Sequence, residues 1–315
     1  MANVAIIGCG LVGRAWAISY AKGGMDVVMW DRDADAPKAA MNYISDILRE
    51  LEEHGLLNGA NCETVLARIS IANTLVDAVK NADHIQENTP EFVDQKKEIF
   101  AELDAAAPDD CIIGSSTSAI LPSKFTEGLK GAHRCLVMHP INPPYIIPAV
   151  EIVPAPWTSD EVVERSRQLL LSAGHAPIVM KRELDGFVMN RLQGALMEEA
   201  FRLVDKGYAT AEDVDVGIRE GLALRWSFMG PFETIDLNAP GGIRDYAERY
   251  EQIYIPIFEQ SNWRADWRGP VMDKIEKDRR ERLPKDKLGE RAVWRDKNLI
   301  ALIAHKNRTK KELGS

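Results

Sequence analysis

A histidine and a glutamate on two neighbouring hydrophobic runs have the types and setting for acid–base chemistry. His139 ends a run that starts at Cys135, and Glu151 lies in a second run beyond a Pro-rich segment. An imidazole at a strand end can take a proton near neutral pH, and a carboxylate on its other nitrogen would fix its tautomer. These two residues therefore have the chemistry of a base and its orienting partner for removing a hydroxyl proton.

Two further polar residues have the chemistry to bind the reacting oxygen. Ser118 follows a predicted strand at 111–115, and Asn190 lies on a predicted helix. Hydrogen-bond donors are needed because that oxygen carries developing negative charge when a ketone is reduced. Each residue also has a structural interpretation, since Ser118 could cap a turn and Asn190 could be an exposed helix residue. The other histidines show no ligand spacing, so we expect no metal site.

A glycine-rich loop near the start of the chain predicts a dinucleotide site. Gly8, Gly10 and Gly13 directly follow the first predicted strand and open a helix. Gly8 permits the tight turn, Gly10 lets the backbone approach a pyrophosphate, and Gly13 allows close packing of helix on strand. The helix N-terminus, with Leu11 and Val12, attracts the anion.

An acidic residue after the second predicted strand favours NAD over NADP. Asp31 can accept hydrogen bonds from the adenosine ribose, and its charge would repel a 2′-phosphate. Arg32 beside it could weaken that repulsion. The two features together predict NAD as the cofactor.

Alternating strand-like and helical runs to about residue 180 predict an α/β fold with a parallel sheet covered by helices on both faces. The predicted strands are 4–7, 26–30, 84–87, 111–115, 135–139, 151–153 and 176–180, and the predicted helices are 12–22, 34–57, 93–106 and 160–173. The stretch 35–67 is longer than one crossover helix needs. It therefore predicts a helical hairpin that projects from the sheet.

Beyond residue 181 only helical patterns remain, at 184–206, 210–222, 232–237, 243–260 and 296–305. Asp185 is a candidate N-cap for the first of them. We expect a Rossmann-type dinucleotide-binding domain at 1–182 with the hairpin as an insertion, followed by an all-α second domain at 183–315. The basic tail, 305–315, is expected to be disordered.

Composition excludes several other classes of protein. A net charge of −9 and the lack of a basic cluster in the N-terminal half argue against nucleic-acid binding. The four cysteines show no paired or metal-type spacing, which suits a reducing compartment. We find no membrane-spanning run and no signal-peptide pattern, so a cytoplasmic location is expected.

Four motifs resemble the 3-hydroxyacyl-CoA dehydrogenase family, and the resemblance covers nearly the whole chain. They are Ser-Ser-Thr-Ser at 115–118, Met-His-Pro-Ile-Asn-Pro-Pro at 138–144, Val-Glu-Ile-Val-Pro at 150–154 and Asp-Gly-Phe-Val-Met-Asn-Arg-Leu at 185–192. The resemblance implies that the catalytic residues are Ser118, His139, Glu151 and Asn190. It also implies that Glu91 and Lys96 lie near the bound NAD, and that the chain forms a homodimer through the helical domain.

Within that family the chain resembles the lambda-crystallin branch, whose enzymes act as L-gulonate 3-dehydrogenases. The residues that carry this are 139–145, 224–234 and 294–302. Arg225 could hold a substrate carboxylate with two parallel hydrogen bonds, or else form a surface salt bridge. The resemblance implies that acyl-CoA members of the family meet CoA at the projecting hairpin. Here the hairpin around Asp46 is acidic and would repel the phosphates of CoA, which favours a small free acid.

We therefore expect an NAD-dependent enzyme that oxidises the C3 hydroxyl of a small hydroxy acid, with L-gulonate the first candidate. Ser118 and Asn190 would bind its oxygen and Arg225 its carboxylate. Three alternatives stay open. They are a 3-hydroxyacyl-CoA dehydrogenase, an L-carnitine dehydrogenase with Trp226 in an aromatic cage, and a non-catalytic, crystallin-like NAD-binding protein.

Overall fold

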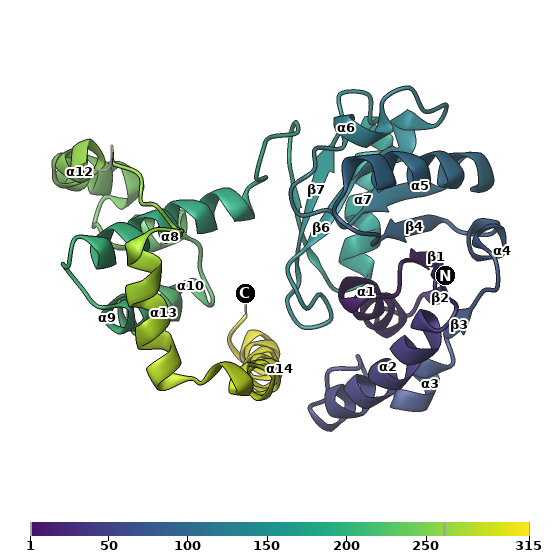
Figure 1. Ribbon diagram of the computed structural model, residues 1–315, viewed down its shortest axis with the longest axis horizontal. Coiled ribbons are helices and arrows are strands. Elements are labelled where there is room, and N and C mark those ends of the chain that lie inside the picture. The colour runs from purple at the N-terminus through teal and green to yellow at the C-terminus, as the bar shows by residue number, and fades with distance from the viewer. Residues whose placement is uncertain (1, 261–262, 315) are drawn as a thin grey trace. The chain divides into compact units, whose positions relative to one another are not determined.

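The computed structural model describes residues 2–260 and 263–314, and the chain forms two compact units (Figure 1). The first unit runs to Met189 and includes the chain again from Lys297, whereas the second covers Asn190–Asp296. The predicted domain boundary between residues 182 and 183 lies slightly before this division. Within the described residues, no helix combines the length and apolar character needed to cross a bilayer.

The first unit is built on an eight-stranded sheet in the order β3-β2-β1-β4-β5-β6-β7-β8. Its strands are β1 (Asn3–Ile7), β2 (Asp26–Trp30), β3 (Ile69–Ile71), β4 (His84–Glu87), β5 (Ile112–Ser115), β6 (Cys135–Pro140), β7 (Ala149–Pro154) and β8 (Ala176–Val179). The order confirms the predicted Rossmann-type α/β fold.

The prediction of an all-parallel sheet was wrong at one place. β6 and β7 are antiparallel, whereas the other neighbouring strands are parallel. The short connection 141–148 contains no crossover helix, and a parallel pair needs a crossover of a dozen residues or more. The short connection therefore makes β7 run back along β6.

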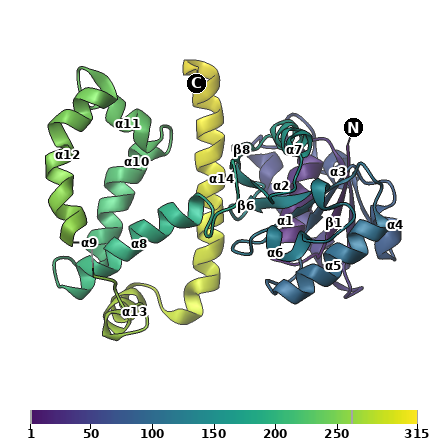
Figure 2. The ribbon, with the colours of Figure 1, turned by 90° about the horizontal axis from the view of Figure 1, so that it is seen from above.

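Helices cover both faces of the sheet, as predicted (Figure 2). The helices of the first unit are α1 (Leu11–Lys22), α2 (Ala36–Glu53), α3 (Cys62–Leu66), α4 (Leu75–Val79), α5 (Val93–Ala106), α6 (Ser123–Thr126), η1 (Ala132–Arg134) and α7 (Asp160–Ser172). One apolar core joins α1, α2 and α7 to the sheet, and another joins α4, α5 and α6 to its opposite face. Alternation along β1 explains this division, because Val4 and Ile6 enter one core while Ala5 and Ile7 enter the other. Helices α2 and α3 form the predicted hairpin.

The helix predicted from residue 184 begins later, at Met189 (α8, Met189–Asp205). Gly186 and Phe187 have φ values of 77° and 49°, which a right-handed helix cannot accommodate. Asp185 is therefore not the N-cap of this helix. A left-handed Phe is rare, so a rule based on apolar spacing extends the helix too far.

The second unit is helical, as predicted. Its elements after α8 are α9 (Ala211–Val216), the π-helix η2 (Gly217–Leu222), α10 (Ala223–Trp226), α11 (Pro231–Leu237), α12 (Gly242–Gln260), α13 (Pro270–Arg282) and η3 (Lys285–Lys287). Phe201, Ala265 and Val271 form a small core, whereas many large apolar side chains of this unit are exposed.

The chain ends in one long helix, α14 (Leu288–Leu313). The expectation of a disordered tail after residue 304 was wrong, because the helix continues to Leu313. Ile300 lies in the core of the first unit, and Ile303 and Ala304 pack against that core. The last part of α14 therefore belongs with the sheet unit rather than with the helical unit.

Candidate active site

The antiparallel β6–β7 pair places His139 directly opposite Glu151. The Nδ1 atom of His139 lies 2.7 Å from Oε2 of Glu151, and both side chains are buried. With the carboxylate as acceptor, Nδ1 carries the proton and Nε2 is left as the basic nitrogen. The pairing suggested by the sequence is thus present as a direct hydrogen bond.

The second oxygen of Glu151 is held by the backbone that leads into α8. Its Oε1 atom accepts hydrogen bonds from the amides of Val188 and Met189, at 2.7 and 2.9 Å. The left-handed conformation of Phe187, just before these residues, turns the chain so that both amides face the carboxylate. The buried Phe187 ring also lies 5.5 Å from the His139 ring, centroid to centroid.

These contacts determine the protonation of Glu151. Burial raises the pKa of its carboxyl group, but the hydrogen bonds from His139, Met189 and Val188 outweigh burial and bring the pKa below its usual value. Glu151 is therefore ionised at neutral pH. An ionised partner stabilises the imidazolium that forms when His139 takes a proton.

Glu91 positions the turn that carries Ser118. Its Oε1 atom accepts hydrogen bonds from the Thr117 hydroxyl and from the amides of Ser118 and Ala119, the last two at 3.0 and 3.1 Å. Ser118 itself is exposed just beyond the end of β5. Glu91 and Ser118, predicted separately as a cofactor residue and a catalytic residue, are thus in direct contact.

Lys96 is buried in an ion pair that the sequence did not reveal. Its ammonium lies 2.8 and 2.9 Å from the two carboxylate oxygens of Glu87 and donates to the Thr89 carbonyl at 2.9 Å. Ser115 also donates to Glu87. The group fixes the chain after β4, next to the cofactor loop. Lys96 does not line the cavity beside the glycine loop, but it contacts Thr89, which does.

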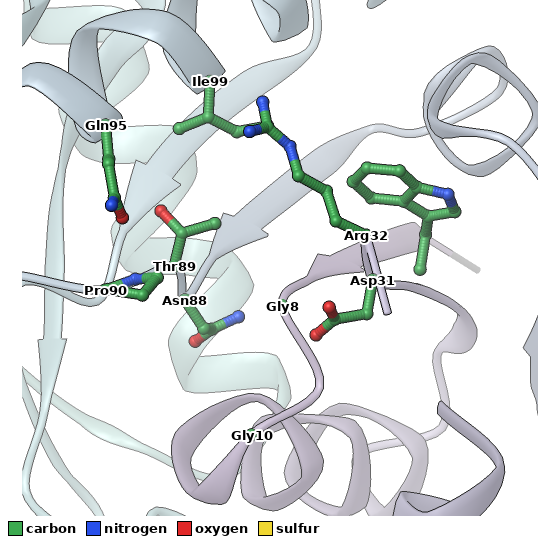
Figure 3. Close-up of a pocket in the computed structure, with 10 residues that line it drawn as sticks. Gly8, Gly10, Asp31, Arg32, Asn88, Thr89, Pro90, Gln95 and Ile99 are labelled. Atoms are coloured by element: carbon green, nitrogen blue, oxygen red, sulfur yellow. The ribbon is translucent and has the colours of Figure 1, made fainter. Parts of the chain in front are cut away.

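A cavity of about 380 Å³ lies beside the glycine loop (Figure 3). Its lining comes from the ends of β1, β2 and β4 and from α5, and comprises Gly8, Gly10, Trp30, Asp31, Arg32, Asn88, Thr89, Pro90, Gln95 and Ile99. This position, at the carboxyl ends of parallel strands, is where doubly wound sheets bind dinucleotides.

The three glycines fit the roles expected of them. Gly8 has a φ of 89°, and a Cβ atom there would lie 2.9 Å from the Asn88 carbonyl. A Cβ atom on Gly13 would lie 1.8 Å from the Gly8 oxygen, which no side chain tolerates. A Cβ atom on Gly10 would meet no protein atom within 4 Å, so this position faces open space, which close approach of a pyrophosphate to the backbone would require. Leu11 and Val12 form the first turn of α1 beyond this loop.

Asp31 is held in place by the loop that it faces. Its two oxygens accept hydrogen bonds from the amides of Cys9 and Asp33, at 2.7 and 3.0 Å. Arg32, which could have softened the selection against NADP, pairs with Glu102 at 2.7 Å. Burial and the Asp31 charge raise the pKa of the Cys9 thiol to about 12, so this cysteine is a neutral spacer.

Two predicted site residues lie in the helical unit. Asn190 is the first residue of that unit and directly follows the Met189 amide that binds Glu151. Arg225 is exposed on α10, one turn after the π-helix. Hydrogen bonding to Tyr254 raises the pKa of Tyr246, and the positive charge of Arg225 opposes that shift.

Sequence reasoning missed Glu87, Thr117 and Phe187 as members of the site. A Glu at the end of a buried strand, followed nine residues later by Lys on a helix, gives a weak signal for a buried pair. The Gly186-Phe187 step was read as helix. The three omissions have the same cause, since these residues act on other protein groups rather than on a ligand.

Comparison with known proteins identifies the family of this chain. Residues 3–183 match the NAD binding domain of 3-hydroxyacyl-CoA dehydrogenase, and residues 186–266 match its C-terminal domain. Lambda-crystallin of Oryctolagus cuniculus is 39% identical over 303 residues, which are 95% of each chain. L-carnitine dehydrogenase of Pseudomonas putida is 40% identical over 247 residues, covering 78% of this chain and 76% of that protein.

A solved structure extends the agreement to the whole fold. The NAD+-dependent 5-formyl-3-hydroxy-2-methylpyridine 4-carboxylic acid 5-dehydrogenase has a TM-score of 0.82 at 27% identity, covering 98% of this chain and 99% of its own. The matches include a nicotinamide-binding domain and several dehydrogenases. The chain therefore belongs to the 3-hydroxyacyl-CoA dehydrogenase family, in its lambda-crystallin branch, and is an NAD-dependent dehydrogenase.

Proposed function

We propose that this dehydrogenase oxidises the C3 hydroxyl of a small free hydroxy acid to a ketone, with L-gulonate as the first candidate. The buried His139–Glu151 pair is the observation that carries the proposal. It supplies a base whose proton-accepting nitrogen is fixed by a held, ionised carboxylate. Such a pair is needed to take a hydroxyl proton near neutral pH.

The cofactor and the protein side chains have separate roles in this reaction. Bound NAD would supply the acceptor for the hydride that leaves C3. His139 takes the hydroxyl proton on Nε2, so that the C–H and O–H bonds break while the C=O bond forms. Glu151 stabilises the resulting imidazolium, and Ser118 and Asn190 hold the substrate oxygen. Asp31, Gly8 and Gly10 would hold the cofactor.

Charge on the hairpin favours a free acid over a CoA thioester. Helix α2 carries Asp46, Glu50, Glu52 and Glu53, and Arg49 is paired with Asp46 at 2.9 Å. A surface for CoA phosphates should instead offer unpaired cations. The acyl-CoA alternative is accordingly the less favoured substrate class.

Arg225 is the candidate that would bind the substrate carboxylate. In the described part of the second unit it forms no ion pair, whereas the nearby Arg219 pairs with Glu220 and Glu212. Among these described residues, Arg225 therefore has no acidic partner for the surface salt bridge that was its alternative role. A π-helical turn, a distortion often found at functional sites, precedes it at Gly217–Leu222.

L-carnitine remains a second candidate substrate because of a specific feature beside Arg225. Trp226 is 40% exposed on the same short helix. An accessible aromatic face can bind a trimethylammonium group through cation–π attraction. The similarity to an L-carnitine dehydrogenase gives this candidate further support.

We further propose that the helical unit forms a homodimer. Its exposed apolar side chains include Phe228, Phe232, Ile253, Ile257 and Phe258. So many large exposed apolar side chains on one unit are typical of a surface that is covered in a stable subunit interface. Sedimentation velocity at micromolar protein concentration would show a monomer if this proposal were wrong.

NADH formation at mildly alkaline pH tests the substrate directly. We would compare L-gulonate, L-carnitine, free L-3-hydroxybutyrate and its CoA thioester at equal concentrations. A preference for a free acid, with KM raised at least tenfold by Arg225→Ala, supports the proposal. The matched control is Arg244→Ala, on the exposed surface of α12. A preference for the thioester, or an unchanged KM in Arg225→Ala, would contradict the assignment of substrate and anchor.

The base is tested separately with His139→Ala. Removing it should lower kcat by about 10²–10⁴-fold. The Kd for NAD should stay within a factor of two, because His139 does not line the cofactor cavity. Near-normal turnover in this variant would exclude the mechanism, whatever the substrate.

A further inference from the structure

A second cavity in the first unit, of about 320 Å³, gathers positive charge. Lys22 reaches it from the end of α1, and Lys306 and Lys310 reach it from one face of α14. Further lining residues come from α1 and α14 themselves, the hairpin turn, the connection before β7, and the turn before β8 with the first residue of that strand. The cavity lies within the sheet unit and shares no lining residue with the cofactor cavity.

The three lysines have no acidic partner in the described structure. No Asp or Glu lines the cavity, and none of the three ammonium groups forms an ion pair within residues 2–260 and 263–314. This is notable in a chain with 48 acidic and 39 basic residues. Three like charges around one hollow attract a counter-charge from solution.

The negative ends of nearby helices offset only part of this positive charge. Lys22 lies in the last turn of α1, and Ala173 and Gly174, at the end of α7, also line the cavity. Lys310 likewise lies in the last turn of α14. Each helix C-terminus carries about half a negative charge, so the three helix ends offset about one and a half of the three positive charges. About one and a half positive charges remain unbalanced.

Lys22 is the innermost of the three cations. Its ammonium donates to the Tyr145 carbonyl at 2.8 Å, and burial lowers its pKa to about 8. It is therefore still mostly charged at neutral pH, with further N–H groups to donate. The adjacent His175 and Ser19 hydrogen-bond to each other at 2.8 Å, and burial lowers the pKa of His175 to about 4, so this pair adds no charge.

We propose that this cavity is a binding site for a small, multiply charged anion that bears carboxylate or phosphate groups. Lys22 would hold the anion from the α1 side, and Lys306 and Lys310 from the α14 side, with Asn307 at the rim. The anion would then link α14 to the sheet unit. The site is distinct from the catalytic one, because α1 spans 12 residues, about 18 Å, between the cofactor loop and Lys22.

Calorimetric titration of the full-length protein with citrate and with inorganic phosphate, in a buffer free of both, tests the proposal. The test variant is Lys306→Ala/Lys310→Ala, because Lys310 is exposed, Lys306 is half-buried and Ala preserves the helix. The control is Lys277→Ala/Lys285→Ala, which removes two exposed lysines elsewhere. Potassium chloride at matched ionic strength separates specific binding from screening.

We expect saturable binding of at least one of the two anions, weakened at least tenfold in the test variant and unchanged in the control. Tighter binding of citrate would identify a carboxylate ligand, and tighter binding of phosphate a phosphorylated one. The anion should also raise Tm beyond the chloride effect, while KM for NAD stays constant. Equal affinity in both variants, or no binding of either anion at 10 mM, a level of about 10 times a weak millimolar Kd, would overturn the proposal.

Discussion

Glu151 lies directly opposite His139 in the β6–β7 pair and binds its Nδ1 atom at 2.7 Å. The same carboxylate accepts the Val188 and Met189 amides. One buried side chain therefore joins the candidate base to the backbone that leads into α8. The orientation of His139 depends on a backbone conformation far away in sequence.

Replacing Glu151 with Gln should lower kcat at least 100-fold. A Gln amide can donate to Nδ1, which would place the imidazole proton on Nε2, where the substrate must deliver its own. Steady-state NADH formation measures the loss. Glu127→Gln, on an exposed turn, is the matched control and should leave kcat unchanged.

The same variant should reveal how Glu151 contributes to stability as pH changes. The pKa of Glu151 is lowered in the folded protein, so its stabilising effect is present above the usual glutamate value of 4.5 and is lost as pH falls below it. The Tm difference between the natural protein and Glu151→Gln should therefore shrink below pH 4.5. A constant difference from pH 7 to pH 3.5 would contradict the ionised assignment.

Phe187 should act as a positioning residue for the base. Phe187→Leu keeps apolar bulk but removes the ring that lies beside His139, so we expect kcat to fall about tenfold, which corresponds to about 1.4 kcal/mol. The acidic limb of the pH–rate profile should also shift. A purely structural role would lower Tm without moving that limb, so the profile decides between the two. Phe125→Leu, in the same core, is the control for packing alone.

The buried Glu87–Lys96 ion pair should stabilise the folded chain beside the cofactor cavity only while both charges are present. Lys96 is 1% exposed and Glu87 is fully buried, so Lys96→Met leaves an unpaired buried carboxylate at a cost of about 3–5 kcal/mol. Tm should drop by roughly 5–15 °C. NAD binding should weaken too, because Thr89 lines the cavity.

The double variant Glu87→Gln/Lys96→Met is the control for that prediction. It removes both charges, so it should recover at least half of the lost Tm. Thermal unfolding followed by circular dichroism provides the comparison. If the double variant were no more stable than Lys96→Met, the cost would come from packing rather than from the unpaired charge.

The sequence pattern was sufficient for the main strands and helices of the sheet unit. The run at 4–7 is buried and apolar, and the run at 26–30 alternates buried positions with more exposed ones, so the local pattern and the final structure agree. Strand β3 was missed because it has three residues, Ile69–Ile71, two of them exposed. The short edge strand β3 forms because it pairs with β2. A local sequence pattern does not encode that pairing.

The His139–Glu151 pair could be predicted because its chemistry is visible in the residue types. The residues that hold the surrounding backbone in place could not be predicted in this way. Glu87 and Lys96 are ordinary surface residue types, and only the fold buries them together. Phe187 adopts a conformation that its type disfavours, held by burial and by the Glu151 contacts. Tertiary structure overrides local preference at these positions.

Two buried histidines should make the first unit sensitive to acid. Burial lowers the pKa of His84 and of His175 from 6.5 to about 4. Between these values the unfolded chain binds more protons than the folded one, so stability falls as pH falls from 6.5 to 4. Each histidine contributes up to about 1.4 kcal/mol per pH unit and about 3 kcal/mol in total.

His84→Gln should halve the dependence of unfolding free energy on pH in this window, while His54→Gln, at an exposed position, should leave it unchanged. Urea unfolding at pH 7, 6, 5 and 4.5 measures both slopes. An unchanged slope in His84→Gln would mean that the histidine does not stay neutral in the folded protein, and the buried Tyr20–His84–Gln86 network would then require a different protonation state.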